Sequence, residues 1–318
     1  MKRRTSLRLE AILAAALVML FACACSLNTP SVDAALQKQA TSPAVSTPAI
    51  KTAGTLTVGL RNTSVTAPFE SVATSGEATG MDVDVASALA DQLGLSVKFV
   101  SVTDAKSALA GTCDIVMNVK SGESGDVTVV GSYAETAAAL FHKGATASVT
   151  TSDVNGKTVG LQSSSVSQRT LARTNLSVTQ KEFTNLNGAF AALDEGSVDY
   201  VLCDAYAGGY LATTYDDMGF CGSLDAPTPL GVGVATSNAT LQGSVKTALD
   251  TISSNGVLAS IHQRWVGDLP TLGASNQVTG ITLTEASTGS NAASSTDATS
   301  ATTNAGNGTT AGSNAVTL

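Results

Sequence analysis

The charged side chains that could bind or transform a small molecule lie where predicted strands end. Arg61 directly follows the alternating strand pattern from Leu56 to Leu60. Asp204 follows a second apolar run, from Tyr200 to Cys203, and a carboxylate held there can pair with an ammonium group. Because ligands of open α/β sheets sit over strand-end loops, these positions predict a binding site for a small polar molecule.

The histidines, cysteines and glycines do not have the spacing required for metal binding, nucleophilic catalysis or dinucleotide binding. His142 and His262 stand alone, with neither a metal-like spacing nor a paired nucleophile. Cys113, Cys203 and Cys221 do not have the spacing of a zinc site, and the chain contains no G-x-G-x-x-G fingerprint. We therefore predict no catalytic residue, no metal and no cofactor.

The elements that would position these residues alternate between strands and helices. The loop after Arg61 leads to a helix in which Asp82 can act as N-cap and Gly94 ends the helix. Nearly continuous apolar residues from Asp114 to Val119 predict a strand that is covered on both faces. This order predicts an α/β fold with mostly parallel sheets flanked by helices. Further strands are expected over 96–102, 133–143 and 231–235, and helices over 105–110 and 188–195, with two more over 241–265 that are separated near Asn255-Gly256.

Composition restricts the folded part and its partners. Aromatic residues occur at Phe21 and then only from Phe69 to Trp265, and the ends are rich in Ser, Thr and Ala. The formal charge is -8, and without residues 1–22 it is -11, so the chain repels nucleic acid phosphate.

Several ordered motifs resemble one family, the bacterial extracellular solute-binding proteins of the amino-acid-binding class. The resemblance covers about two thirds of the chain. It is carried by A-P-F-E-S at 67–71, G-M-D-V-D-V-A from residue 80, G-x-V-D-x-x-x-x-D at 196–204 and N-G-x-L-A-x-I-x-x-R-W at 255–265. The resemblance implies a two-lobed fold of the type 2 periplasmic-binding-protein class, with a two-strand hinge.

The resemblance also implies a set of ligand contacts between the lobes. Asp204 matches the aspartate that holds an α-ammonium in the family. Asp126 stands where the family has the arginine for an α-carboxylate, and no arginine occurs from Asn62 to Gln168, so Arg61 and Lys120 are the available first-lobe cations. The full predicted set is Arg61, Thr66, Phe69, Asn118, Lys120, Ser121, Ser164, Ser165 and Asp204.

Each of these residues also has a structural interpretation. Asp204 can cap the helix that follows it, and Arg61 and Lys120 can be solvated surface charges. Phe69 can pack within its lobe, and the serines and Asn118 can serve turns and caps.

In function, the resemblance implies a monomeric binding component of an ABC transporter that delivers a small polar solute to a permease. It does not imply an enzyme. Two alternatives stay open. The first is a ligand-sensing or surface protein with a changed pocket, and the second is a cyclohexadienyl-dehydratase-like enzyme that would use Glu135 as its acid.

The N-terminus predicts export. A basic start and an apolar run from Ala11 to Ala22 have the order of a signal peptide, and Leu20 to Cys23 resembles a bacterial lipobox in which the cysteine is acylated. Cys25 is a second candidate, and a plain cleaved signal or an uncleaved anchor is the alternative. Outside the cell Cys203 and Cys221 could form a disulfide, or all three remaining cysteines could be buried thiols.

The expected organisation therefore has six parts. They are a signal peptide (1–22), a lipid-anchored flexible linker (23–53), the first part of lobe 1 (54–143), lobe 2 (144–229), the return to lobe 1 with the C-terminal helices (230–268) and a disordered tail (269–318).

The lipid anchor can be tested by changing the predicted acylation site. In Cys23→Ala the protein should move from the membrane fraction to the medium, because its attachment then lacks acyl chains. Fractionation and immunoblotting measure this, with Cys25→Ala as the matched control. Unchanged membrane retention of Cys23→Ala, and of the double variant, would contradict the anchor.

Overall fold

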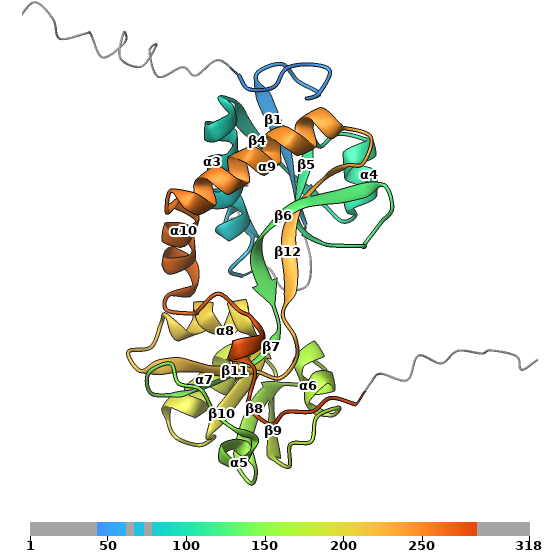
Figure 1. Cartoon of the computed structure of the whole chain (residues 1–318). Helices are drawn as coiled ribbons and strands as arrows, with labels where there is room; N and C mark the ends of the chain where they lie inside the picture. Colours follow the sequence, from blue (N-terminus) through green and yellow to red (C-terminus); the bar gives the residue numbers. More distant parts are fainter. Residues whose placement is uncertain (1–42, 62–66, 73–77, 285–318) are drawn as a thin grey trace, which may run out of the picture. The chain divides into compact units, whose positions relative to one another are not determined.

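A computed structural model of the chain describes residues 43–61, 67–72 and 78–284 (Figure 1). The predicted signal peptide, Cys23, Thr66 and the tail from residue 285 lie outside the described residues. Within the described part, no helix combines the length and the apolar content needed to cross a membrane.

The first sheet has five strands in the order β4-β1-β5-β12-β6. β1 is fully buried from Leu56 to Leu60 and pairs in parallel with β4 and β5, whereas β12 runs antiparallel to β5 and β6. The strands are β1 (Thr55–Arg61), β4 (Ser96–Val102), β5 (Ile115–Lys120), β6 (Val127–Thr136) and β12 (Thr228–Ala235). The carboxyl ends of β1 and β5 therefore lie next to each other at one edge.

Four helices accompany this sheet: α3 (Met81–Leu93), α4 (Ala105–Ala110), α9 (Ala239–Ser254) and α10 (Val257–Val266). The predicted N-cap of α3 is wrong. Gly80 occupies that position with φ 139°, and a Cβ there would lie 2.2 Å from the Phe69 carbonyl oxygen, so only glycine fits. Asp82 lies instead inside the helix and is buried, while Gly94 ends the helix in the left-handed conformation as predicted.

The second sheet has the order β11-β7-β10-β8-β9. Its strands are β7 (Ala138–Lys143), β8 (Thr158–Gln162), β9 (Thr179–Phe183), β10 (Tyr200–Asp204) and β11 (Met218–Ser223). Its helices are α5 (Thr151–Val154), α6 (Val166–Leu171), α7 (Leu186–Asp194) and α8 (Ala205–Ala212). A separate two-stranded ribbon joins β2 (Ser71–Val72) to β3 (Ala78–Thr79).

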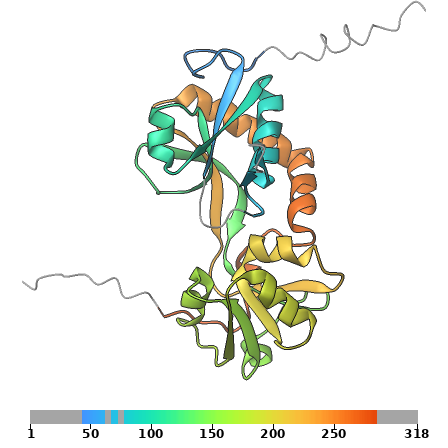
Figure 2. The ribbon, with the colours of Figure 1, turned by 180° about the vertical axis from the view of Figure 1, so that it is seen from behind.

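Besides the connection that leaves α10 for the second sheet, two segments join a strand of one sheet to a strand of the other, and both can be followed from either side in Figures 1 and 2. One runs from β6 to β7 and the other from β11 to β12. We expected one strand over 133–143, but the strand ends at Thr136 and a new one starts at Ala138, where it joins β10 and β11. The first crossing therefore lies at Ala137, earlier than the expected boundary at residue 143, and the return strand begins at Thr228.

The folded part also extends further at both ends than composition predicts. Ile50 is fully buried, and Lys51 donates from its backbone nitrogen to Asp114 (2.8 Å) and from Nζ to the Leu109 carbonyl (2.8 Å). Residues 269–284 pack on the second sheet. Val278 is 1% exposed and donates to the Ser223 carbonyl (2.9 Å), and η1 (Ala274–Asn276) precedes it.

Cys113, Cys203 and Cys221 are buried free thiols, which is the second of the two alternatives above. The possible disulfide between Cys203 and Cys221 is not formed. β7 lies between the strands that carry the two residues, and two strand spacings of about 4.8 Å exceed the Cα separation that a disulfide spans.

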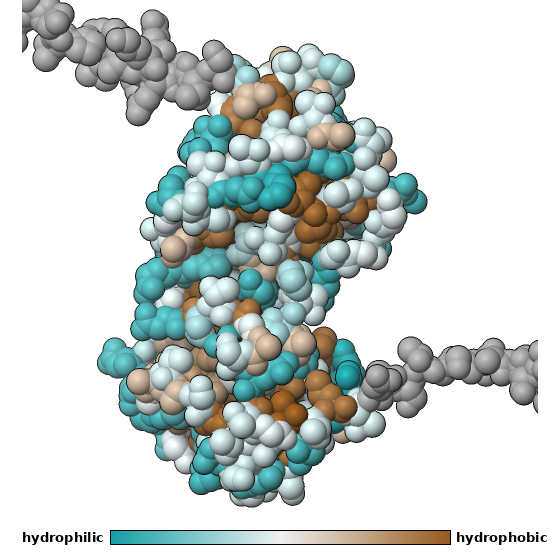
Figure 3. All heavy atoms as spheres, viewed as in Figure 1, coloured by the Kyte–Doolittle hydropathy of each residue, from teal (hydrophilic) through white to brown (hydrophobic). Residues whose placement is uncertain are grey.

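Figure 3 shows mostly hydrophilic and weakly polar residues on this face, with strongly hydrophobic residues visible among them in the upper and the lower part. Among the described residues, Val166 and Val257 are the large apolar side chains that are exposed. Single exposed apolar residues of this kind are ordinary on a protein surface.

The C-terminal segment 269–284 should stabilise the second sheet. Truncation after Asp268 removes the burial of Leu272 and Val278, so the free energy of unfolding should fall by roughly 2 kcal/mol or more. Urea unfolding measures the change. Truncation after Thr284 is the matched control and should leave the midpoint in place. Equal midpoints for the two truncations would contradict the structural role of this segment.

Candidate ligand-binding site

Residues predicted to bind a ligand gather at the carboxyl edge of the first sheet. Arg61 ends β1, and Asn118 and Lys120 end β5, the neighbouring strand. The Arg61 Nη1 donates to the Asn118 carbonyl oxygen at 3.1 Å. Parallel pairing of β1 and β5 thus brings together the Arg61 side chain and the Asn118 backbone, which are 57 positions apart in the sequence.

Arg61 is also held by an acidic residue that sequence analysis missed. Glu123, in the turn after β5, accepts from Nη1 at 2.9 Å through one oxygen and lies 2.6 Å from Nη2 through the other. The same carboxylate accepts from the Lys120 backbone nitrogen at 3.3 Å. The two side chains are 16% and 30% exposed, so the ion pair is partly shielded from water. It is therefore stronger than an ordinary surface pair.

Asp204 enters from the second sheet, at the carboxyl end of β10. It is the N-cap of α8, and its Oδ1 accepts from the backbone nitrogens of Tyr206 (3.0 Å) and Ala207 (3.1 Å). Its Oδ2 accepts from the hydroxyl of Thr136, the last residue of β6. The capping role that we gave as the alternative is thus present, and the same carboxylate also meets the strand that crosses from the first sheet.

Burial raises the pKa of the Asp204 carboxyl above its usual range. The Thr136 hydroxyl, the two backbone N–H groups and the charge of Lys120 each lower that pKa by a smaller amount. Lys120 is exposed and lies near enough to act on Asp204 electrostatically. The positive charge of Lys120, from the first sheet, therefore lowers the pKa of a carboxyl on the second sheet, but by less than burial raises it.

Asn118 and Ser164 have an unusual backbone. Both have φ 59°, and they are the described non-glycine residues with positive φ. Such conformations cost energy and concentrate at functional sites. Asn118 donates from its backbone nitrogen to the Tyr133 hydroxyl (2.9 Å), and Ser164 donates in the same way to the Gln168 Oε1 (2.8 Å).

The remaining predicted residues divide between packing and solvent. Phe69 is 6% exposed and stacks on Tyr206, with ring centroids 5.3 Å apart, so it contributes to packing. Ser165 caps α6 by accepting from Gln168 (3.1 Å), and Ser121 is exposed in the turn after β5.

Asp126, which occupies the family's arginine position in the sequence, pairs with Lys106 at 2.7 Å. Both side chains are more than half exposed, so this pair lies at the surface. Asp126 thus has Lys106 as its ion-pair partner. With aspartate in the place of arginine, the cationic side chains at the carboxyl ends of β1 and β5 are Arg61 and Lys120.

Tyr206, which the sequence did not indicate, lies next to the site together with Glu135, which the sequence named only as the acid of the enzyme alternative. The Tyr206 hydroxyl donates to Glu135 Oε2 at 3.2 Å, and the ring of His262 lies edge-on to Tyr206 at 5.9 Å. Burial raises the pKa of Glu135, while the bond from Tyr206 and the charge of His262 lower it. The sequence signal that could have identified Tyr206 as a neighbour of the site is its position two residues after Asp204, at the end of a strand.

Behind Asn118 lies a buried acidic cluster formed by Glu70, Asp82 and Tyr133. The Tyr133 hydroxyl donates to Asp82 Oδ1 at 2.5 Å, and both residues are almost fully buried. Burial raises the pKa of Asp82 to about 8; the Tyr133 bond lowers it and the neighbouring charge of Glu70 raises it. The hydroxyl that supports the Asn118 backbone is therefore itself fixed by a buried acid.

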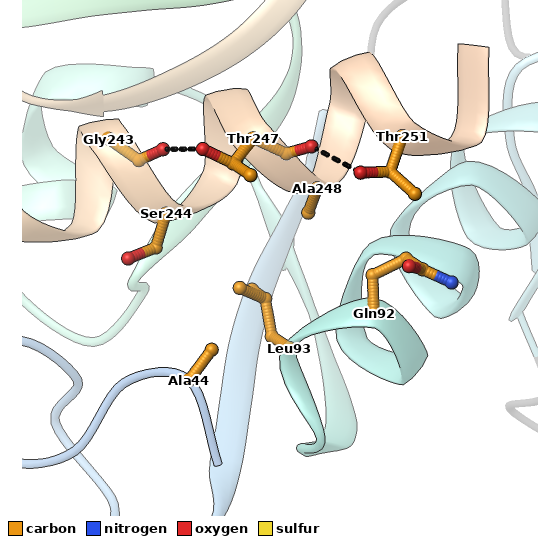
Figure 4. A pocket seen from close by; sticks show the side chains of 8 residues that line it. All are labelled: Ala44, Gln92, Leu93, Gly243, Ser244, Thr247, Ala248 and Thr251. Atoms are coloured by element: carbon orange, nitrogen blue, oxygen red, sulfur yellow. Dashed lines mark hydrogen bonds between the residues drawn. The ribbon is translucent and has the colours of Figure 1, made fainter. Parts of the chain in front are cut away.

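The hollows found among the described residues lie elsewhere. One of about 240 Å³ opens between α3 and α9 (Figure 4), where the Thr247 and Thr251 hydroxyls donate back to carbonyls of their own helix. Its lining residues are Ala44, Gln92, Leu93, Gly243, Ser244, Thr247, Ala248 and Thr251. A second, of about 570 Å³, borders residues 43–49 and the start of α9. Among the described residues no group of three metal-ligating side chains occurs.

The model of one protein family matches residues 56–268, under the description "Bacterial extracellular solute-binding proteins, family 3". The chain belongs to this family. As a family 3 solute-binding protein, it resembles an arginine-binding periplasmic protein of Mannheimia haemolytica. The two are 25% identical over 211 residues, which are 63% of this chain and 87% of the relative.

Solved structures share the fold of this solute-binding protein. A substrate-binding protein of a polar amino acid ABC uptake transporter from Streptococcus thermophilus is 20% identical, with TM-score 0.60, over 69% of this chain and 88% of that one. The L-cystine solute receptor of Neisseria gonorrhoeae, in its unliganded open conformation, is 21% identical, with TM-score 0.58, over 69% and 95%. These neighbours confirm the α/β fold with two sheets that the sequence predicted.

The buried acid of this solute-binding protein should make its stability depend on pH. Because the pKa of Asp82 is raised, the folded state holds a proton that the unfolded chain releases above about pH 4. The stabilising contribution of Asp82 is therefore lost as the pH rises toward about 8. Asp82→Asn should remove up to about 1.4 kcal/mol per pH unit from this slope.

Urea unfolding between pH 5 and 8 measures the slope. Asn keeps an oxygen for the Tyr133 hydroxyl, and Asp91→Asn, on an exposed position of the same helix, is the matched control. A slope that stays the same in Asp82→Asn and in the control would rule out a protonated Asp82.

Proposed function

We propose that this family 3 protein binds a small polar solute that carries a cationic amino group, an amino acid or a related amine. Binding takes place where the carboxyl edges of the two sheets face each other, and the solute is then delivered to an ABC transporter permease. The observation that carries the proposal is the place of Asp204, a carboxylate of the second sheet that contacts Thr136 and is influenced by Lys120 of the first.

The chemistry of Asp204 suits an ammonium ligand. Oδ1 accepts two backbone N–H groups and Oδ2 one hydroxyl, which leaves lone pairs for a further charged donor. Shielding from water strengthens the attraction between an ammonium group and this carboxylate. An ammonium group would also favour the ionised form of Asp204 and so offset the effect of burial on its pKa.

The relatives support an amino-acid or amine ligand. One is described as arginine-binding and another as part of a polar amino acid uptake transporter, which favours transport over a sensing role. The dehydratase alternative depends on Glu135, whose carboxylate is bound to Tyr206 in the packing between the sheets. We further propose that the protein acts outside the cytoplasm as a monomer, attached to the membrane through acylated Cys23.

Replacing the carboxylate of Asp204 should separate ligand binding from folding. Asparagine caps helices as well as aspartate does, so Asp204→Asn should keep α8 while it loses the charge. We expect binding of an amine ligand to weaken by ~2–5 kcal/mol, the range for truncating one side of a buried charge pair. A thermal-shift screen of amino acids, amines, peptides and organic acids first identifies the ligand, and calorimetry then measures its affinity.

The ligand's deamino analogue should fail to bind wild type, whereas its carboxamide should lose less affinity than the deamino compound. Asp194→Asn is the matched control, because it removes an exposed carboxylate of the second sheet's α7 that pairs with Lys143. Normal binding of the parent ligand to Asp204→Asn, with equal loss of the carboxamide and the deamino compound, would refute the proposal.

A further inference from the structure

Arg61 is the only arginine that this part of the chain offers to the edge of the first sheet, since the next one in the sequence is Arg169. A guanidinium group binds a carboxylate best through two parallel N–H donors. In the structure both terminal nitrogens of Arg61 are already directed to Glu123, at 2.9 and 2.6 Å. The fork that a ligand carboxylate would need is therefore occupied by a carboxylate of the protein.

Glu123 is placed to keep this position. It accepts from the Lys120 backbone nitrogen, and Arg61 also donates to the Asn118 carbonyl, so the pair is fixed to the end of β5 from both sides. Its partial shielding from water makes the pair costly to break, because either charge would lose its partner.

Lys120 does not replace Arg61 in this role. Its charge acts on Asp204 of the second sheet, and its ammonium offers point-like rather than two-pronged recognition. A free carboxylate on a ligand would thus find Arg61 bound to Glu123, and beside it Lys120, a single ammonium group without a two-pronged donor.

We propose that Glu123 determines the ligand class of this site. Its carboxylate occupies the Arg61 guanidinium in the way that a ligand carboxylate otherwise would. A ligand gains nothing from a free carboxylate that must first displace Glu123. The site therefore accepts amines and amino acids whose carboxyl group is blocked at least as well as free amino acids. This inference rests on the proposed function, since it concerns the ligand of the same site.

The test compares L-arginine with L-argininamide, which differ only at the carboxyl group. Isothermal calorimetry on the full chain gives the ratio of the two dissociation constants. In wild type we expect a ratio within about threefold of one. In Glu123→Gln the released Arg61 should favour L-arginine by a further tenfold or more, about 1.4 kcal/mol.

The matched control is Asp126→Asn. It removes one negative charge from the same turn, but its partner is Lys106 and it does not contact Arg61. Its ratio should equal that of wild type, which separates the specific pair from a general change in charge.

A measurement without ligand reports on the ion pair itself. Phenylglyoxal modifies free guanidinium groups, and mass spectrometry can follow Arg61 with the exposed Arg169 and Arg264 as internal references. Arg61 should react several-fold faster in Glu123→Gln than in wild type or Asp126→Asn, while the reference residues react equally in all three proteins.

The outcomes are distinguishable. Faster modification together with the tenfold shift supports the proposal. Equal modification of Arg61 in all three proteins overturns it, because Glu123 then does not hold the guanidinium. Faster modification with an unchanged ratio also overturns it, since the pair then has no part in selection. If neither probe binds wild type or any variant, the proposed function itself fails for this ligand class and the inference fails with it.

Discussion

A carboxylate that is removed from water needs hydrogen bonds or a nearby positive charge to offset its lost hydration. In this molecule the buried carboxylate that joins most elements is Asp204. It satisfies the first turn of α8, which would otherwise leave backbone N–H groups unpaired, and it accepts the hydroxyl of Thr136 where the chain leaves the first sheet. One residue therefore joins the end of a strand, the start of a helix and the crossing between the sheets. The nearby Ala205 nitrogen, which donates to the Ala137 carbonyl at 2.9 Å, reinforces the same junction.

The same requirement organises the edge of the first sheet. Asp82, inside α3, is fixed by the Tyr133 hydroxyl, which in turn accepts from the Asn118 backbone, and the Asn118 carbonyl accepts from Arg61. Glu123 completes the series by neutralising Arg61. The strained backbone at Asn118 is thus supported from the core on one side and from the loop on the other. The carboxylates, the Tyr133 hydroxyl and both terminal nitrogens of Arg61 have partners in this series, whereas the buried Arg61 Nε has no hydrogen-bond partner among the described residues.

The sequence predicted the strands and the residues at their ends well, because strand periodicity is a local property. It also named Arg61, Asn118 and Asp204 as ligand contacts, and that role stays a prediction. It could not predict the pair of Arg61 with Glu123, which depends on β1 and β5 being adjacent in the sheet. The cap of α3 was wrong because the close approach of Phe69 requires glycine at position 80, and nothing in the local sequence signals that contact. Residues 269–284 were expected to be disordered because they are polar, yet they pair through backbone groups that composition does not reveal.

The self-compensated charges change how affinity can arise in a member of this family that lacks the usual arginine. Where a site presents an unpaired cation, a ligand carboxylate adds a new attraction. Here the cation has a partner at 2.6 Å, so a carboxylate can only exchange with it, and the net gain is the difference between two similar interactions. In the proposed binding mode, selectivity comes from the amino end of the ligand, through Asp204, and from hydrogen-bonding groups such as the Asn118 and Ser164 side chains, whose backbone is held in one conformation. In such a rigid polar site, a ligand that leaves a buried group unpaired loses affinity. This loss is larger than the affinity gained from an additional charge on the ligand.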